Sequence, residues 1–332
     1  MSEHAAASGE AAKGGPEGGG YRVVIVALVI NLLIAAFKFL AAALSRSTAM
    51  LAEAVHSLAD TANQAFLLIG MKRSSRPPDQ LHPFGYGTES YFWAFIVAGS
   101  IFLIGAAVSI WEGAEKLLLI LRGEPVHEGN VYWAIGVLSV SLILEAWSLR
   151  TALAEFRHLA GGRGLRQALR DIRDPTVLTV LFEDLAALFG LVAALIGVTL
   201  SYLTGQPIWD ALASIVVGVA LGTVAFYLGR DSMSLLIGEA VPQEEHQKLI
   251  EIAAAQPGVL QVIHLRTLHI APQEVLAAFK LRFARDLTMD GLEERINELE
   301  KTLRTAYPHL RRIYIEPGFD EAALRRSRGE IE

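Results

Sequence analysis

Cysteine is absent from this 332-residue chain. The absence excludes disulfide bonds, thiolate metal sites and cysteine nucleophiles in a single step. Any metal that the protein binds must therefore use nitrogen and oxygen ligands. Charge is also scarce, because only 19% of the residues are Asp, Glu, Lys or Arg. The formal net charge of -6, without a basic stripe among aromatic residues, argues against a nucleic-acid partner.

Long apolar runs are abundant, and 52% of the residues are hydrophobic. Six runs reach the length of about 20 residues that a helix needs to cross a lipid bilayer. They cover residues 21–44, 48–71, 90–119, 131–154, 176–204 and 208–228. Residues 1–20 are small, polar and rich in glycine, which predicts a disordered tail. The pattern predicts an α-helical membrane protein with six transmembrane helices in a domain over residues 21–238.

From about residue 239 the apolar runs end and shorter periodic patterns begin. Helical spacing of apolar residues predicts two helices, and alternation predicts three strands. The helices cover residues 243–255 and 289–307, and the strands cover residues 259–270, 275–283 and 312–315. This order is typical of a small α+β domain with its helices on one face of a sheet. We expect this domain over residues 239–319, followed by a charged tail over residues 320–332.

The basic residues give the orientation of the six spans. Lys72, Arg73 and Arg76 follow the second span, and five arginines occupy the loop after the fourth span. The loops at the opposite end carry few basic residues, and the turn between the fifth and sixth spans carries none. Because cytoplasmic loops are rich in Lys and Arg, both termini are expected in the cytoplasm. A chain without cysteine or a targeting segment fits the inner (plasma) membrane of a bacterium.

The second span carries two polar side chains that need a partner inside a bilayer. His56 and Asp60 are four residues apart, so they lie one above the other on one helix face. A charged Asp at mid-membrane costs roughly 3 kcal/mol and persists where it pairs, faces water or binds a ligand. A histidine and a carboxylate at this spacing make half of a site for a divalent cation. The remaining ligands must come from another helix.

The fifth span offers further carboxylates. Asp184 is the best candidate for the third ligand, and Glu183 lies about 100° away around the helix. Glu183 is a candidate fourth ligand, a candidate proton carrier, or the partner of a cation such as Lys38. Asn63 lies two turns after His56, and it is either a weak oxygen ligand or the donor of an interhelical hydrogen bond.

Two other ionisable residues have a simpler structural explanation. Lys38 in the first span can pair with an acid or extend towards the membrane surface, and Glu145 in the fourth span can be structurally paired. His56, Asp60 and Asp184 are different, because structural pairing would have to satisfy all three. We therefore expect this trio to bind metal or protons. Since ligands must be deprotonated to coordinate, metal binding and proton release are linked.

Several motifs resemble those of the cation diffusion facilitator family, the zinc-transporter family of metal/proton antiporters, over nearly the whole chain. They are NLLIAAFKFL in the first span, AEAVHSLADTANQ in the second, HPFGYGTES and WEGAEKL around the third, and WDALASIVVGVALG through GEAVP in the sixth. The context LFEDLAALFG in the fifth span looks closer to the branch of the mitochondrial zinc exporter. The resemblance implies a ferredoxin-like cytoplasmic domain and a homodimer. It also implies that spans two and five of each protomer form the transport site.

The chain departs from the family pattern at two places. Val180 stands where zinc-transporting members usually have histidine, so one of four standard ligands is missing and the site is richer in oxygen. In the loop after the second span, Asp79 and His82 match positions that can bind a peripheral metal. Tyr86 replaces a usual histidine there, which makes this peripheral site weak.

The sequence thus predicts a divalent cation/proton antiporter that exports Zn²⁺, or a related ion such as Mn²⁺, Co²⁺, Fe²⁺ or Cd²⁺, from the cytoplasm by alternating access. Two alternatives belong to other classes. A membrane metalloenzyme needs an open coordination position and a general base, and no HExxH-type motif is present. A non-transporting subunit or regulator with a degenerate metal site is motivated by the missing histidine.

Overall fold

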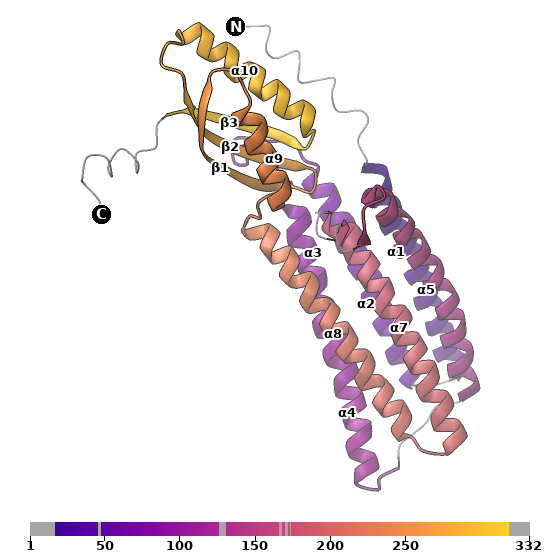
Figure 1. Ribbon diagram of the computed structural model, residues 1–332. Coiled ribbons are helices and arrows are strands. Elements are labelled where there is room, and N and C mark those ends of the chain that lie inside the picture. Colours follow the sequence, from indigo (N-terminus) through magenta and orange to yellow (C-terminus); the bar gives the residue numbers. More distant parts are fainter. Residues whose placement is uncertain are drawn as a thin grey trace. The chain divides into compact units, whose positions relative to one another are not determined.

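The computed structural model describes residues 17–45, 48–125, 131–165, 168–169, 172 and 174–318. The chain divides into two compact units (Figure 1). The first contains the long helices. The second contains the loop over residues 74–88 and the chain from Met233 onwards.

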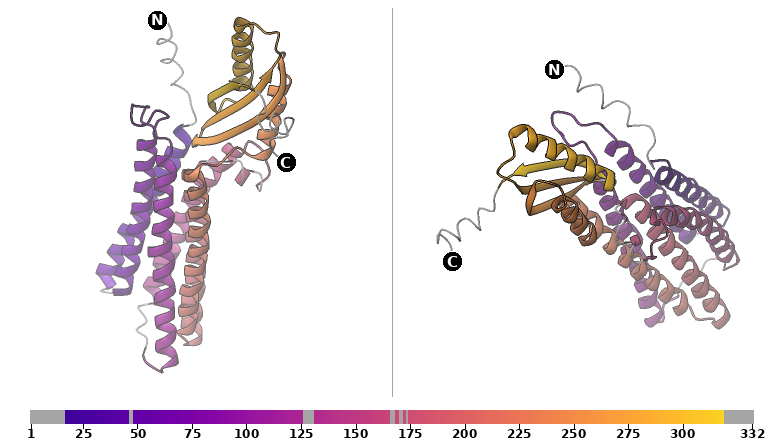
Figure 2. Two further views of the ribbon diagram at one scale, coloured as in Figure 1. Left: turned by 90° about the vertical axis from the view of Figure 1, so that its left-hand side faces the viewer. Right: turned by 45° about the horizontal axis from the view of Figure 1, so that its top comes forward.

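Long helices that lie side by side make the first unit (Figure 2). Five are continuous: α1 (Glu17–Ser45), α2 (Thr48–Ser74), α5 (Val131–Ala160), α7 (Pro175–Thr204) and α8 (Ile208–Ile237). The third apolar run is built from three segments: α3 (Glu89–Ser100), the π-helical η1 (Ile101–Ala107) and α4 (Val108–Leu121).

Five helical stretches among the described residues are long and apolar enough to cross a membrane: Gly20–Leu44, Glu89–Leu121, Val131–Ala160, Pro175–Thr204 and Ile208–Ile237. The helix α2 has 27 residues, but its middle is too polar to meet the same criterion. Its polar side chains Ser57, Asn63 and Gln64 are buried against other helices rather than exposed. We therefore assign α2 as the sixth span, in agreement with the fold class predicted from the sequence.

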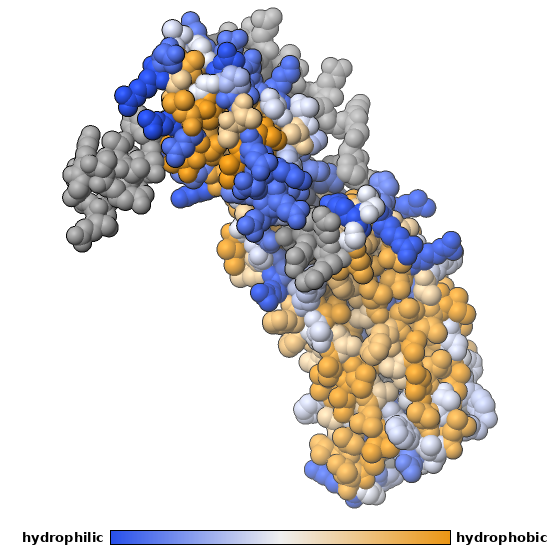
Figure 3. All heavy atoms as spheres, viewed as in Figure 1, coloured by the Kyte–Doolittle hydropathy of each residue, from blue (hydrophilic) through white to orange (hydrophobic). Residues whose placement is uncertain are grey.

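The outward surface of the helical unit is apolar. Figure 3 shows hydrophobic atoms over most of the visible face of these helices. Large exposed apolar side chains come from several helices, among them Leu33, Phe102, Ile143, Ile196 and Phe226. An apolar surface of this extent would be unfavourable in water and is matched to a lipid environment.

The helix α1 begins earlier than the sequence predicts. Residues 17–20 were expected in the disordered tail, but the structure includes them in α1. Gly20 lies close to α7, since a Cβ atom placed on it would come within 3.6 Å of Val177 Cγ2. Packing against a neighbouring helix here overrides the low helix propensity of glycine. Residues 1–16 and 319–332, which make up most of the predicted tails, lie outside the described residues.

Local sequence signals fix both ends of α7. The Asp174 side chain accepts hydrogen bonds from the N–H groups of Thr176 (3.0 Å) and Val177 (3.4 Å), and Pro175 occupies the first helical position. Gly205 ends the helix with φ of 65°, a left-handed conformation that glycine adopts without strain. These caps set the position of α7 along the chain, and therefore which of its residues stand near mid-helix.

The second unit is an α+β domain. Its sheet has the order β1-β2-β3, with β1 (Val259–Ala271) antiparallel to β2 (Glu274–Phe283), and β2 parallel to β3 (Leu310–Pro317). The helices α9 (Gln243–Ala254) and α10 (Met289–Ala306) lie on one face of the sheet (Figure 1). Apolar residues of both helices and all three strands form its core. The element types and order agree with the sequence prediction, with boundaries that differ by a few residues.

Glycines bring the backbone of α8 close to the third span. A Cβ atom on Gly113 would lie 2.7 Å from Ile215 Cγ1 and 2.8 Å from the carbonyl oxygen of Ala211. A Cβ atom on Gly218 would lie 2.6 Å from Ile110 Cγ1. These approaches leave no room for a larger residue, so glycine is required for this helix packing.

We expect Gly113→Ala to lower the thermal unfolding midpoint, because the added methyl group meets backbone atoms of α8 and overpacking costs about 1–3 kcal/mol. The matched control is Gly136→Ala on α5, where nothing lies within 4 Å of the new Cβ atom. There the higher helix propensity of alanine should leave the midpoint unchanged or raise it. Equal shifts in the two variants, measured in the same detergent, would contradict this packing argument.

Candidate metal site

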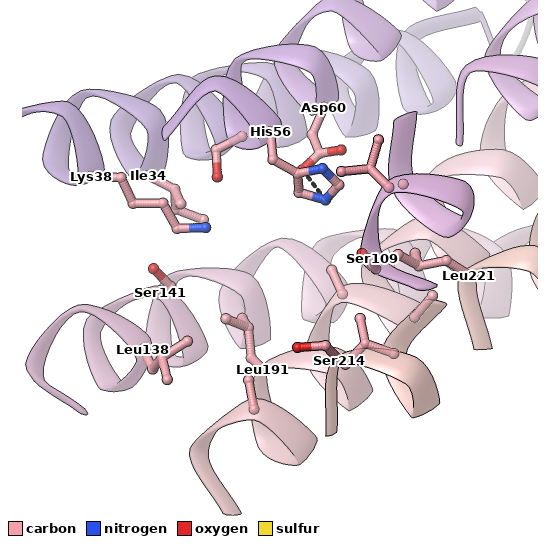
Figure 4. Close-up of a pocket in the computed structure, with 18 of the residues that line it drawn as sticks. Ile34, Lys38, His56, Asp60, Ser109, Leu138, Ser141, Leu191, Ser214 and Leu221 are labelled. Carbon is pink, nitrogen blue, oxygen red and sulfur yellow. Dashed lines mark ion pairs between the residues drawn. The ribbon is translucent and has the colours of Figure 1, made fainter. Parts of the chain in front are cut away.

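A cavity of about 490 Å³ lies within the helical unit (Figure 4). Side chains from α1, α2, the third span, α5, α7 and α8 line it. Its ionisable lining residues are Lys38, His56, Asp60, Glu112, Lys116, Glu145, Glu183 and Asp210. An internal space with this many charged groups, set among apolar helices, is suited to hold ions and water.

The cavity occupies one half of the helical unit. Along α7 the described lining residues run from Glu183 to Ser201, and along α8 they run from Asp210 to Leu221. These stretches lie next to the turn that joins the two helices. The halves of α7 and α8 beyond Glu183 and Leu221 contribute no lining residue among those described. The cavity therefore extends from mid-helix towards the α7–α8 turn.

His56 and Asp60 project from α2 into this cavity (Figure 4). Their Nε2 and Oδ2 atoms are 4.0 Å apart, and about a third of each side chain is exposed (30% and 35%). The helical spacing places the two groups on one face, and the cavity leaves them accessible. An imidazole nitrogen and a carboxylate oxygen at this separation can both reach a single metal ion at about 2 Å.

Glu183 of α7 joins this wall of the cavity to α2. Its Oε1 atom accepts a hydrogen bond from Asn63 Nδ2 (3.1 Å), and its Oε2 atom accepts one from Gln64 Nε2 (2.7 Å). All three side chains are buried. We call these two hydrogen bonds the α2–α7 clasp. The interhelical hydrogen bond is one of the two roles predicted for Asn63, whereas the contact of Gln64, another polar residue in the same apolar run, was not predicted.

The amide of Asn63 also keeps one atom available. The nitrogen of the amide donates to Glu183, which is the orientation that an ionised carboxylate requires. The Oδ1 atom then has no hydrogen-bond partner among the described residues, and the residue lines the cavity. The clasp and an oxygen ligand are therefore compatible roles for Asn63.

Asp184 is placed differently from the expectation. It is completely buried and does not line the cavity, and neither carboxylate oxygen has a hydrogen-bond partner among the described residues. Ser148 of α5 is a neighbouring polar group, without hydrogen-bond geometry. Because adjacent residues point about 100° apart on a helix, only one of Glu183 and Asp184 faces the cavity.

The predicted trio His56, Asp60 and Asp184 is thus not assembled in this conformation. Among the residues that the structure describes, no three His, Asp or Glu side chains stand close enough to hold one metal ion. A buried carboxylate without partners is costly, since an unsatisfied buried polar group costs about 1–3 kcal/mol and a charged one costs more. Asp184 therefore needs a proton or a cation, and α7 would have to rotate to bring it to the α2 pair.

The charged groups at the α7–α8 end of the cavity were not predicted as part of the site. Lys116 of α4 and Asp210 of α8 form an ion pair there, with Nζ 2.8 Å from Oδ2. Both residues stand near the ends of their helices, where charged side chains look like solvated surface in a sequence.

The loop over residues 74–88 uses Asp79 as a structural acceptor. Its Oδ1 atom accepts hydrogen bonds from the N–H groups of Leu81 (2.9 Å) and His82 (2.7 Å), and Tyr86 donates its hydroxyl to Oδ2 (2.7 Å). The His82 ring packs on the Tyr86 ring at 4.2 Å. The hydrogen bond from Tyr86, followed by that from the His82 backbone, lowers the pKa of Asp79. The weak peripheral metal site at Asp79 and His82 stays a prediction, and a metal would have to displace these bonds.

We expect Tyr86→Phe to raise the pKa of Asp79 towards the ordinary Asp value of about 3.9, because the largest stabilising hydrogen bond is lost. Because the folded loop lowers the pKa of Asp79, the ionised carboxylate stabilises the loop at pH values above the ordinary pKa of Asp. This stabilisation is lost as the pH falls through the lowered pKa. Carboxyl NMR titration of the labelled protein measures the shift. An unchanged titration in the variant would contradict the assigned role of Tyr86.

An internal cavity with imidazole and carboxylate groups between membrane-spanning helices defines a membrane protein that handles cations inside the bilayer. Residues 24–237 match the family model for the cation efflux transmembrane domain, and residues 241–317 match that for the cytoplasmic domain of cation efflux proteins. The chain belongs to the cation efflux, or cation diffusion facilitator, family. This is a family of metal-ion transporters and not of enzymes, as the sequence predicted.

Three relatives show the range of the family. The proton-coupled zinc antiporter SLC30A9, mitochondrial, of Xenopus laevis is 36% identical over 282 residues, covering 84% of this chain and 48% of the relative. Metal tolerance protein C4 of Arabidopsis thaliana is 33% identical over 307 residues, covering 91% and 64%. The manganese efflux system protein MneP of Bacillus subtilis is 23% identical over 309 residues, covering 90% and 97%. This chain spans about half the length of the vertebrate relatives that it matches.

Proposed function

We propose that this protein is a cation/proton antiporter that exports Zn²⁺ from the cytoplasm. The observation that carries the proposal is the pair His56 and Asp60, which presents a nitrogen and an oxygen ligand to a cavity between membrane helices. Membership of a metal-transporter family and the likeness to a protein named as a proton-coupled zinc antiporter support it.

The imidazole favours zinc over harder ions. Histidine nitrogen suits Zn²⁺, whereas Mn²⁺ is usually held by oxygen ligands. The other candidate ligands here are all oxygens, from Asp60, Asp184, Glu183 and Asn63, and one relative is named for manganese efflux. Mn²⁺, Co²⁺, Fe²⁺ and Cd²⁺ are therefore the ions to compare with Zn²⁺.

Proton coupling follows from the same ligands. Without a metal, the carboxylates inside the membrane must be neutralised by protons or paired with cations, because isolated charges there are costly. A metal that binds Asp60 and Asp184 displaces protons from them, and protons return when it leaves. Exchange of metal for protons across the membrane then needs only that the site opens to each side in turn.

We expect Zn²⁺ to drive proton flux in proteoliposomes of the wild-type protein and Asp60→Asn to abolish it, because the substitution removes a ligand with little change in size. The control is Glu115→Gln, an exposed carboxylate of α4 that does not line the cavity. A pH-sensitive dye inside the vesicles reports the flux for each of the five metals. Folded wild-type protein that moves no metal would favour a non-transporting subunit or regulator instead.

Alternating access gives the α2–α7 clasp a role. With both termini in the cytoplasm, the α7–α8 turn lies on the outer side, so the cavity extends from the site towards the outer side. The clasp between Glu183 and the amides of Asn63 and Gln64 then closes the inner side of the site. An inward-open state would have to break these hydrogen bonds.

We expect Gln64→Leu to shift the equilibrium towards the inward-open state. Loss of one buried hydrogen bond costs about 1 kcal/mol, which changes a two-state ratio roughly fivefold. The chain has no cysteine, so Ala59→Cys, which lines the cavity, can serve as a single reporter. In the variant that carries Ala59→Cys alone, a membrane-impermeant thiol reagent should label the cysteine faster from the outer side. Adding Gln64→Leu should increase labelling from the inner side. Labelling that is unchanged by Gln64→Leu would remove the gating role.

We also propose a homodimer in the inner membrane of a bacterium, with cytoplasmic termini. The match to the cytoplasmic domain of cation efflux proteins supports dimer formation, and Leu260, Leu268 and Tyr314 on the strands are exposed. The relatives come from several compartments and kingdoms, so the bacterial location rests on the sequence alone. Of the arginines used for the orientation, Arg157 and Arg163 are described, whereas residues 166, 170 and 173 lie outside the described part of the chain.

A further inference from the structure

An ion pair stands at the end of the cavity that is next to the α7–α8 turn. Lys116 Nζ of α4 lies 2.8 Å from Asp210 Oδ2 of α8, and both residues line the cavity. The backbones of the two helices come together beside this pair, because a Cβ atom on Gly113 would lie 2.8 Å from the carbonyl oxygen of Ala211. The close packing gives the ion pair a fixed place in the cavity wall.

The cavity face of the third span leads from the candidate metal site to this pair. Gly105 lies beside His56, since a Cβ atom on it would be 3.8 Å from His56 Cε1. Ser109, Glu112 and Lys116 follow at spacings of three or four residues, and all of them line the cavity. Figure 4 shows Ser109 in this wall. A metal ion that moves outwards from His56 along this face reaches Lys116 last.

Stability alone does not account for the ion pair. The exposed fractions of the two side chains are 37% for Lys116 and 28% for Asp210. Ion pairs with this access to water contribute little to stability, because solvent screening and the loss of side-chain freedom offset their attraction. The packing of Gly113 already holds α4 against α8. We therefore looked for the function of the pair in its charges.

Lys116 changes the charge that a cation meets at this end of the cavity. On α4 and α8, the described ionisable residues that line the cavity are Glu112, Lys116 and Asp210. The two carboxylates carry two negative charges, and the lysine offsets one of them. Carboxylate oxygens are the ligands that Ca²⁺ and Mg²⁺ prefer. An ammonium group has no lone pair to offer a metal ion and repels it.

We propose that Lys116 prevents divalent cations from binding at the outer end of the cavity. Asp210 holds the ammonium group in place. A metal ion released from His56 and Asp60 then meets no second binding site on its way out, and Ca²⁺ or Mg²⁺ from outside does not occupy the exit. This inference rests on the proposed transport function and on the orientation with cytoplasmic termini.

The test measures how Ca²⁺ inhibits Zn²⁺-driven proton flux in proteoliposomes of the full chain. Ca²⁺ prefers carboxylate oxygens to imidazole, and at equal concentrations on both faces of the membrane it reaches protein of either orientation. Lys116→Met should lower the Ca²⁺ concentration for half-inhibition about tenfold, the order of magnitude expected when one unit charge is lost from a partly exposed site. The double variant Lys116→Met/Asp210→Asn should return to the wild-type value, because it removes one charge of each sign.

Asp210→Asn alone distinguishes an electrostatic role from a tie between helices. It breaks the ion pair but keeps the ammonium group, so the half-inhibiting concentration should stay at the wild-type value or rise. If the pair only joined α4 to α8, both single variants would lower this concentration equally, and the double variant would keep the shift. That pattern, or an unchanged value in Lys116→Met, would overturn the proposal. Arg122→Met is the matched control, since this cation at the end of α4 does not line the cavity, and it should leave the value unchanged.

Calcium binding to the purified protein tests Lys116 without transport. A ligand that binds the folded state raises the thermal unfolding midpoint. Ca²⁺ should raise the midpoint of Lys116→Met more than that of the wild type or of the double variant, and equal shifts in all three would also overturn the proposal. Wild-type protein that moves no metal would refute the transport function, and the calcium-dependent midpoints would still decide the role of Lys116.

Discussion

A charge inside a lipid bilayer must have a partner, and this constraint accounts for the arrangement of the helical unit. Apolar side chains such as Phe102 and Ile143 cover its outer surface, while the acids of α2, α5 and α7 turn inwards. The described lysines that line the same cavity are Lys38 and Lys116. The inward acids create an excess of negative charge that a divalent ion or protons can balance. The charged lining of the cavity thus follows from the exclusion of charged side chains from the lipid-facing surface.

The sequence predicted the features that depend on local periodicity. Apolar runs gave the helices, alternation gave the strands, and the spacing of four residues gave the shared face of His56 and Asp60, because all of these follow from the geometry of a single element. The caps of α7, which were seen only in the structure, are local in the same way, since Asp174, Pro175 and Gly205 act within one turn. The wall of the site also depends on contacts between helices, which local periodicity does not predict.

The contacts between helices depend on how each helix is rotated about its own axis relative to its neighbours. The spacing of apolar residues in the sequence does not determine these rotations. Glu183 and Asp184 are neighbours in sequence, and only the orientation of α7 decides that Glu183 faces the cavity. Gln64 has a role because α7 presents that carboxylate to it. Lys38 and Glu145 each had a separate structural explanation in the sequence, and the packing of the helices makes both line the same cavity. Contacts between residues that are far apart in the chain cannot be predicted from a single sequence.

The π-helical segment η1 carries a different consequence. It spans Ile101–Ala107 beside the cavity, and a Cβ atom on Gly105 would lie 3.8 Å from His56 Cε1. A π-helical turn contains one residue more than an α-helical turn. The segment therefore holds an extra residue, while the residues after it keep the faces that they would have in a regular α-helix. Removing one residue there would leave a regular helix with Glu112 and Lys116 on their present faces. In an alignment of related chains, this is the place within the third span where a gap would be tolerated.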